Sequence, residues 1–137
     1  VGPQGFLTVD GCRVSRCATG LSAGGYAVIR TINAESTHNS NYGMFVTNMS
    51  RAVVDESLKL TNNSQFGLLV SNTSQVFTGF LAPGGQYEIR NNSLAGIQIL
   101  YDALVVSTTG GGGPFSFSDN GPTGFKHIET LLGGHTY

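Results

Sequence analysis

The feature that most constrains this chain is a nine-residue motif that occurs twice. Residues 62–70 have the sequence NNSQFGLLV, and residues 91–99 have the sequence NNSLAGIQI. Two asparagines, a serine, a glycine and alternating aliphatic residues occupy the same positions in both copies. A repeated motif of this kind predicts an architecture of similar units stacked on one another.

Alignment on the motif glycine extends the pattern to five repeats. The glycines stand at positions 20, 43, 67, 96 and 124, with spacings of 23, 24, 29 and 28 residues. An apolar residue follows each glycine. Two positions further on stand Ala23, Val46, Val70, Ile99 and His127. This alternation predicts a short, half-buried strand after each glycine. His127 is the exception in an inward column, and we interpret it as the end of the coil.

Each repeat contains two further candidate strands. The strand before the motif has the inward pairs Ala34/Ser36, Leu58/Leu60, Tyr87/Ile89 and Phe115/Phe117, with Val14 in place of Leu60 in the first repeat. A weaker strand after the glycine strand covers 51–54, 75–78 and 104–107. The chain is therefore predicted to be an all-β solenoid of about five rungs. One domain, 1–137, contains it, and we interpret this domain as a piece of a longer chain.

Stacking gives the motif asparagines a physical role. In parallel coils, equivalent residues lie about 4.8 Å apart, so five rungs make a rod roughly 24 Å long. Asn39, Asn63, Asn92 and Asn120 then form a column in which each amide donates to the next. The glycine allows a bend that a Cβ would block. The motif is thus expected to be structural and not catalytic.

The pattern Asn-Asn-x-x-x-Gly-Ile-x-Ile resembles the repeats of right-handed parallel β-helices of the pectate-lyase type. The resemblance covers about residues 6–128 and is specific for fold. Among such proteins the chain is most similar to a piece of a phage tailspike. This resemblance implies a homotrimer or a larger assembly, located on a virion or outside a cell, that recognises polysaccharide.

Composition excludes several other classes of function. Only 11% of residues are charged and the net charge is −1, so no basic footprint for nucleic acid or membrane is present. No apolar run reaches 18 residues, and no signal peptide is visible. No cofactor motif or metal site is predicted. Cys12 and Cys17 are expected to be small buried thiols.

Weak catalytic candidates come from one outward column. Glu35, Lys59 and Glu88 occupy equivalent positions, so the two carboxylates should lie about 9.6 Å apart with the lysine between them. That separation suits an inverting hydrolase. A surface ladder of alternating charge explains the same pattern.

The candidate binding residues are Lys59, Arg90, Tyr42 and Tyr101. Arg90 is expected to face the same side as the carboxylates, where it can contact an anionic sugar or remain a solvated arginine. The tyrosines sit at bends, where their rings can stack on sugars or pack against loops. Two glycine-rich loops, 79–86 and 107–114, leave the coil at one corner, where inserts often build a binding face.

Two columns of apolar residues should point outward. Phe45 and Leu69 form one, and Val53, Phe77 and Val106 form the other unless the strand parity changes at the preceding turn. An exposed apolar face of this size predicts a partner. Three functions remain open: a β-helical tailspike or fibre piece that recognises cell-surface polysaccharide, a polysaccharide lyase, hydrolase or epimerase, and a bacterial surface adhesin.

Overall fold

The computed structural model describes residues 1–78, 85–107, 112–121, 128–131 and 135–136. Every described element is a β-strand, and all the strand pairs are parallel. Most of the two predicted glycine-rich loops, and His127, lie outside the described residues. The predicted all-β class and the stacking of parallel strands are confirmed.

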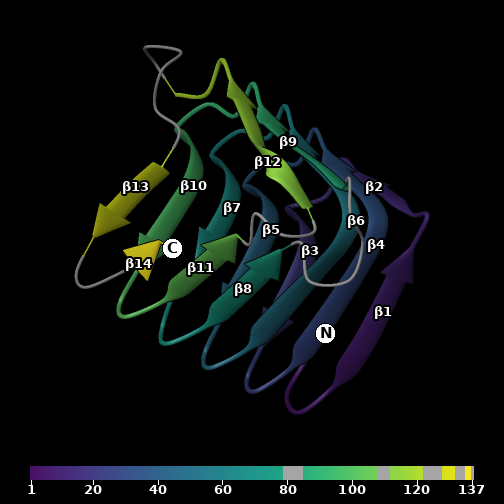
Figure 1. Cartoon of the computed structure of the whole chain (residues 1–137), viewed down its shortest axis with the longest axis vertical. Coiled ribbons are helices and arrows are strands. Elements are labelled where there is room, and N and C mark those ends of the chain that lie inside the picture. Colours follow the sequence, from purple (N-terminus) through teal and green to yellow (C-terminus); the bar gives the residue numbers. More distant parts are fainter. Residues whose placement is uncertain (79–84, 108–111, 122–127, 132–134, 137) are drawn as a thin grey trace.

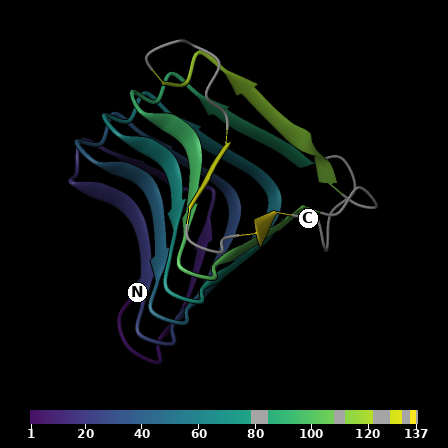
Figure 2. The same cartoon turned by 90° about the vertical axis from the view of Figure 1, so that its left-hand side faces the viewer.

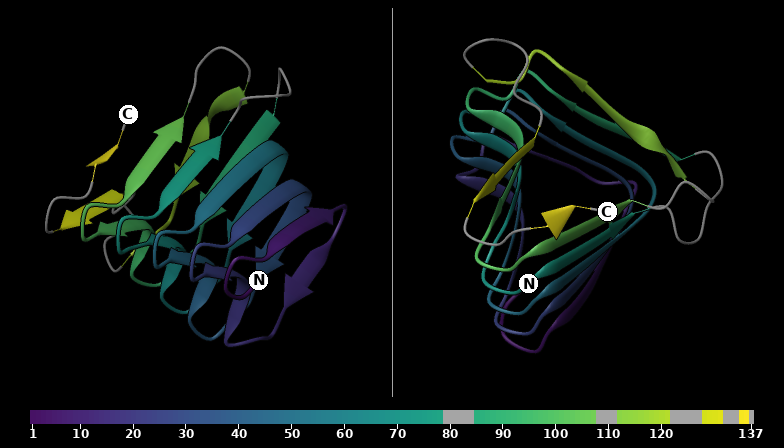
Figure 3. Two further views of the ribbon diagram at one scale, coloured as in Figure 1. Left: turned by 90° about the horizontal axis from the view of Figure 1, so that it is seen from below. Right: turned by 60° about the vertical axis from the view of Figure 1, so that its left-hand side comes forward.

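The strands form three walls around a roughly triangular core (Figures 1, 2 and 3). The β1 wall contains β1 (Phe6–Asp10), the first part of β4 (Val28–Thr37), the first part of β6 (Arg51–Thr61), β8 (Gln75–Thr78), β11 (Leu104–Ser107) and β14 (His135–Thr136). The β2 wall contains β2 (Arg13–Ser15), the remainder of β4 and β6, β9 (Gly85–Arg90) and β12 (Gly112–Ser118). The β3 wall contains β3 (Thr19–Gly24), β5 (Tyr42–Thr47), β7 (Phe66–Val70), β10 (Ala95–Leu100) and β13 (Ile128–Leu131).

The register of these walls is the one the repeats predict, up to the fourth repeat. In the β3 wall Met44 pairs with Leu68, which pairs with Ile97. In the β2 wall Leu60 pairs with Ile89. Val14 pairs with Ser36, as the one-residue deletion requires. Equivalent residues therefore stack directly over one another.

The last repeat was predicted in the wrong register. Ile97 pairs with Ile128 and Ile99 pairs with Thr130, three residues later than the predicted partners Phe125 and His127. This register keeps a histidine out of an apolar column, where an imidazole would need a buried hydrogen-bond partner. The coil makes about three turns, slightly fewer than the predicted five rungs, although five strands stack in the β3 wall.

The core is a continuous stack of inward side chains. Its largest fully buried members include Met44, Leu58, Leu68, Tyr87 and Ile97. Each coil alone would leave these residues on an open face, so the coils are stable only when stacked. The burial follows the predicted alternation in strands such as β5 and β8, whereas β7 is buried at every position.

The predicted asparagine column is a buried ladder of hydrogen bonds. The backbone N–H and the side-chain Nδ2 of Asn39 both donate to Oδ1 of Asn63, at 3.1 and 2.9 Å. Asn63 donates in the same way to Asn92, and Asn92 to Asn120. In the first coil the equivalent position is Cys17, and its backbone N–H donates to Oδ1 of Asn39. The four asparagines are fully buried, so the ladder satisfies backbone donors at a corner where no strand pairing exists.

The residue before each ladder asparagine turns the chain. Arg16, His38, Asn62, Asn91 and Asp119 have φ between 53° and 59°. Asparagine and aspartate tolerate this left-handed conformation better than most residues. The residue before the ladder asparagine therefore makes the bend, and the asparagine itself forms the ladder.

The motif positions need glycine because the adjacent coil leaves no space for a Cβ atom. A Cβ on Gly43 would lie 2.7 Å from the carbonyl oxygen of Gly67 and 2.7 Å from Nδ2 of Asn63. A Cβ on Gly67 would meet the carbonyl oxygen of Gly96 at the same distance. The backbone of one coil therefore rests directly on the next coil at this point, beside the ladder.

A second, shorter ladder lies at the corner between the β3 and β1 walls. The Ala27 N–H donates to Oγ of Ser50, and the Ser50 N–H donates to Oγ of Ser74. Both serines are buried. Ser50 and Ser74 are 24 residues apart, the spacing of Gly43 and Gly67, so the repeat alone could have predicted this ladder.

The outward apolar columns are less exposed than expected. Val53, Phe77 and Val106 do point outward, since their neighbours Ala52 and Val54 are buried, but all three are half-buried. Leu69 is buried and Phe45 is half-buried. The large exposed apolar side chains are elsewhere, at Phe6, Leu7, Tyr26, Met49, Leu94 and Tyr101.

Replacing Asn63 tests the ladder. Asn63→Val removes the acceptor of two Asn39 donors and leaves buried polar groups unpaired, so the free energy of unfolding should fall by roughly 2–5 kcal/mol. The control is Asn91→Gly, at an exposed left-handed position, which should change it by less than about 0.5 kcal/mol. Urea denaturation of both variants measures the difference, and equal effects would contradict the ladder.

A pair of glycine variants tests the close approach of the coils. Gly43→Ala should destabilise the protein by about 2 kcal/mol or more because its Cβ meets backbone. Gly24→Ala in β3 is the matched control, since its Cβ would have only the Thr47 Cγ2 at 3.7 Å. Thermal melting should show a large loss for the first variant alone. A tolerated Gly43→Ala would mean that the coils are further apart.

Candidate functional site

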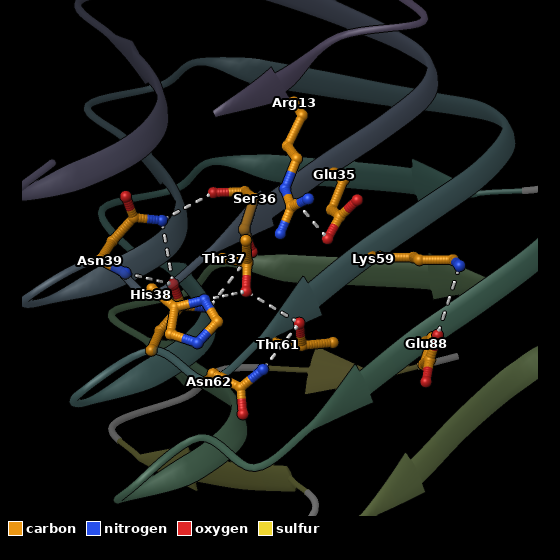
Figure 4. A network of polar contacts seen from close by, with 11 residues as sticks. Arg13, Glu35, Ser36, Thr37, His38, Asn39, Lys59, Thr61, Asn62 and Glu88 are labelled. Carbon is orange, nitrogen blue, oxygen red and sulfur yellow. Dashed lines mark hydrogen bonds and ion pairs between the residues drawn. The ribbon is translucent and has the colours of Figure 1, made fainter. Parts of the chain in front are cut away.

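The charged candidates from the sequence lie together on the outer face of the β2 wall. Arg13, Glu35, Lys59 and Glu88 occupy one column, the charged column, in successive strands. The neighbouring column contains Ser15, Thr37, Thr61 and Arg90. Figure 4 shows Arg13, Glu35, Lys59 and Glu88 of the charged column, and Thr37 and Thr61 of the neighbouring one. The predicted order of Glu35, Lys59 and Glu88 across three strands is the observed one.

The carboxylates of the charged column are both engaged by cations. Nε of Arg13 lies 3.5 Å from Oε1 of Glu35. Glu88 is contacted on one oxygen by Nζ of Lys59, at 3.8 Å, and on the other by Nε of Arg90, at 2.5 Å. Both oxygens of Glu88 thus face a cation. A cation beside a carboxylate favours the ionised form, whereas a general acid has to be protonated. The column has the form of a surface ladder of ion pairs, each worth a fraction of a kcal/mol.

Positive charge is concentrated on this wall. Arg13, Arg16, Lys59 and Arg90 are four of the seven lysine and arginine residues of the chain. The side chains of Lys59 and Arg90 are 50% and 51% exposed, so their cationic groups remain accessible to solvent while they pair with Glu88. A flat row of accessible cations suits the binding of an extended polar or anionic chain.

The two candidate tyrosines lie at different corners. Tyr42 starts β5, beside the β2 wall, and its ring stacks on Phe66 with centroids 6.1 Å apart and tilts against Phe45 at 5.3 Å. Phe66 is buried, whereas the rings of Tyr42 and Phe45 are half-buried. Tyr101 is 50% exposed but lies between the β3 and β1 walls. It is therefore not brought together with Lys59 and Arg90.

A chain of buried hydroxyl groups on the β2 wall was missed by the sequence analysis. Nδ2 of Asn62 donates to Oγ1 of Thr61, which lies 3.1 Å from Oγ1 of Thr37. Oγ1 of Thr37 lies 2.9 Å from Nδ1 of His38. Both threonines are buried although they belong to an outward column. Hydrophobic alternation cannot reveal such a chain, because the signal lies in stacked threonines that pair across coils.

A second ion pair lies on the β1 wall and is structural. Nε of Arg30 lies 2.5 Å from Oδ2 of Asp55, which is 2% exposed. Oδ1 of Asp55 has no hydrogen-bond partner in the described part of the chain. Asp55 lies at the corner where β6 bends, beside Glu56 with φ of 58°. The pair joins two coils and does not belong to the charged column.

The cysteines differ from the prediction. Cys12 and Cys17 are both exposed free thiols, not buried ones. They lie in the first coil, where no preceding strand covers them, so a column that is buried elsewhere is open here. Within the described ranges, no three His, Cys, Asp or Glu side chains gather closely enough to hold a metal ion. The same ranges contain no helix that could cross a bilayer.

Comparison with known proteins identifies no relative. No protein-family profile matches the chain, and neither the curated proteins nor the solved structures contain a significant match. The functional argument therefore depends on the arrangement of side chains on the solenoid.

Proposed function

We propose that the chain is a β-helical portion of a viral tailspike or fibre, of the phage type, that recognises cell-surface polysaccharide. The binding surface is the outer face of the β2 wall, together with the aromatic cluster of Tyr42. Its location would be the virion or the cell exterior. The observation that carries the proposal is that Arg13, Lys59 and Arg90 stay at least half exposed on one wall of stacked strands, although each is paired with a glutamate.

The geometry suits a long, regular ligand. Stacked coils place side chains about every 4.8 Å along the rod, so an extended polymer on this wall meets cations and carboxylates in alternation. Lysine and arginine donate hydrogen bonds to sugar hydroxyls and to anionic groups. The half-buried ring of Tyr42, stacked on the buried Phe66, lies at the edge of the same wall. The half-buried outward column of the β1 wall is left for contact with another subunit.

A second candidate is a polysaccharide lyase, hydrolase or epimerase. It is favoured by the alignment of Glu35 and Glu88 two strands apart, with Lys59 between them. Against it stands the pairing of both carboxylates with cations. A bacterial surface adhesin is the third candidate, because it would share the composition and the cation row. A wall anchor or a secretion signal in the complete gene would favour the adhesin over the viral protein.

Binding to a panel of neutral and acidic polysaccharides tests the main proposal. Lys59→Gln and Arg90→Gln should each weaken the affinity for a bound polysaccharide by at least about fivefold, because each removes a charge-assisted hydrogen bond. Arg51→Gln is the matched control. It removes one exposed cation from the β1 wall, where Arg51 donates to Oε1 of Gln75, and should leave the affinity within about twofold.

Three results separate the candidates. Failure to bind any polysaccharide, or an equal loss with Arg51→Gln, would contradict a binding face on the β2 wall. Release of shorter products, abolished by Glu88→Gln, would favour the enzyme. Cleavage that survives Glu88→Gln would exclude Glu88 as its catalytic residue.

The assembly can be tested separately by measuring mass in solution. A tailspike piece of this kind should form trimers, covering the β1 wall column of Val53, Phe77 and Val106. Analytical ultracentrifugation at micromolar concentration should then give three times the mass of one chain, and Phe77→Lys should shift the mass toward that of the monomer. A stable monomer at that concentration would count strongly against the tailspike proposal.

A further inference from the structure

One end of the β2 wall holds a pocket that the cation row alone does not explain. It is an open, polar pocket lined by Arg13, Ser15, Arg16 and His38. Arg13 and Ser15 come from β2, Arg16 follows β2 at the corner, and His38 occupies the equivalent corner one coil later. Figure 4 shows Arg13 and His38 on the same side of the wall. Three of the four lining side chains can carry positive charge.

The cationic donors of this pocket are largely unused. The side chain of Arg16 makes no ion pair or hydrogen bond with any described residue. Arg13 contacts Glu35 through Nε alone, at 3.5 Å, which leaves its terminal nitrogens available. An arginine fork and a serine hydroxyl are typical donors to oxyanions. Arg16 also occupies a left-handed position, with φ of 59°, where the next coils have histidine and asparagine.

The buried hydroxyl chain ends at the ring of His38. Nδ2 of Asn62 donates to Oγ1 of Thr61, and the hydroxyls of Thr61 and Thr37 can be oriented so that Thr37 donates to Nδ1 of His38. In that orientation a neutral imidazole carries its proton on Nε2. His38 can then donate a hydrogen bond to the pocket through Nε2.

We infer that this pocket is a binding site for a tetrahedral oxyanion, a phosphate or sulfate group. Four separate donors surround it, which matches a group with three or four acceptor oxygens. A planar carboxylate is best bound by one bidentate arginine, and Nε of Arg13 already faces a carboxylate. The site deepens the proposed function and rests on it only in one respect: on a polysaccharide, the group would be a phosphate or sulfate ester.

Titration with inorganic phosphate and inorganic sulfate at pH 7 and low ionic strength tests the site without any polysaccharide. Amide and imidazole NMR signals of residues 13–17 and 38 should shift in a saturable way, and acetate should bind more weakly by at least about threefold. Arg16→Asn and His38→Asn should each weaken phosphate binding by about fivefold or more. Both replacements introduce the residue that the same left-handed column has at Asn62 and Asn91, so the fold is preserved.

Two further variants make the test discriminating. Arg51→Gln removes one positive charge from the β1 wall and should leave phosphate affinity within about twofold. Glu35→Gln should tighten it, because it frees Arg13 and removes a negative charge next to the pocket. Unsaturable shifts, equal losses with Arg51→Gln, acetate binding as tight as phosphate, or weaker binding by Glu35→Gln would each overturn the site.

Binding of a phosphorylated or sulfated polysaccharide then distinguishes the source of the group. If inorganic phosphate binds and no polysaccharide does, the anion site is correct and the proposed function is wrong. If a neutral polysaccharide binds at Lys59 and Arg90 while inorganic anions do not bind, the proposed function survives and the anion site is wrong.

Discussion

A buried side-chain amide is stable only if both its donors and its acceptor find partners, and the rod depends on a column of such amides. Each of Asn39, Asn63 and Asn92 donates twice to the Oδ1 atom of the asparagine that follows in the ladder. Nδ2 of Asn92 also donates to the backbone carbonyl of Leu60 at 2.9 Å, whereas Nδ2 of Asn39 donates to Oγ of Ser36. These bonds fix the corner between the β2 and β3 walls. The positions of all outward side chains on both walls follow from that corner.

The periodic part of the structure could be predicted because stacking copies one pattern many times. Leu60 over Ile89, and Met44 over Leu68, follow from aligning the motif glycines, since an inward residue must pack on an inward residue. The alignment failed at Gly124, where the strand takes the register of Ile128 instead. A histidine in an otherwise apolar column was the sign of that error, because a buried imidazole needs a hydrogen-bond partner.

The candidate site was predictable only where its residues follow the period of the coil. Placing Glu35, Lys59 and Glu88 in one column needs only the period of the coil. Which charges actually pair depends on side-chain conformation, and Arg90 reaches Glu88 from the adjacent column. The Thr37–Thr61–His38 contacts depend on hydroxyl groups stacked between coils, which carry no hydrophobic signal. The cysteines were misjudged because burial was inferred from residue type, whereas the first coil has no neighbour on one side.

Fold alone does not assign a function to a solenoid, because its core is occupied by structural repeats and its activity lies on the outward columns. On this rod the columns differ in character from wall to wall. The β2 wall holds most of the positive charge, whereas the β1 wall carries a half-buried apolar column and one buried ion pair. This division favours one wall for a polar ligand and another for contact between subunits.

The dependence of the rod on its amide ladder can be measured directly by hydrogen exchange. The backbone N–H groups of Asn39, Asn63 and Asn92 lie at a bend, outside any strand, and donate to side chains. If the ladder holds the coils together, these amides should exchange as slowly as those of Leu68 and Ile97 in the β3 wall, with the free energy of global unfolding. Exchange at the rate of an open loop would contradict the account.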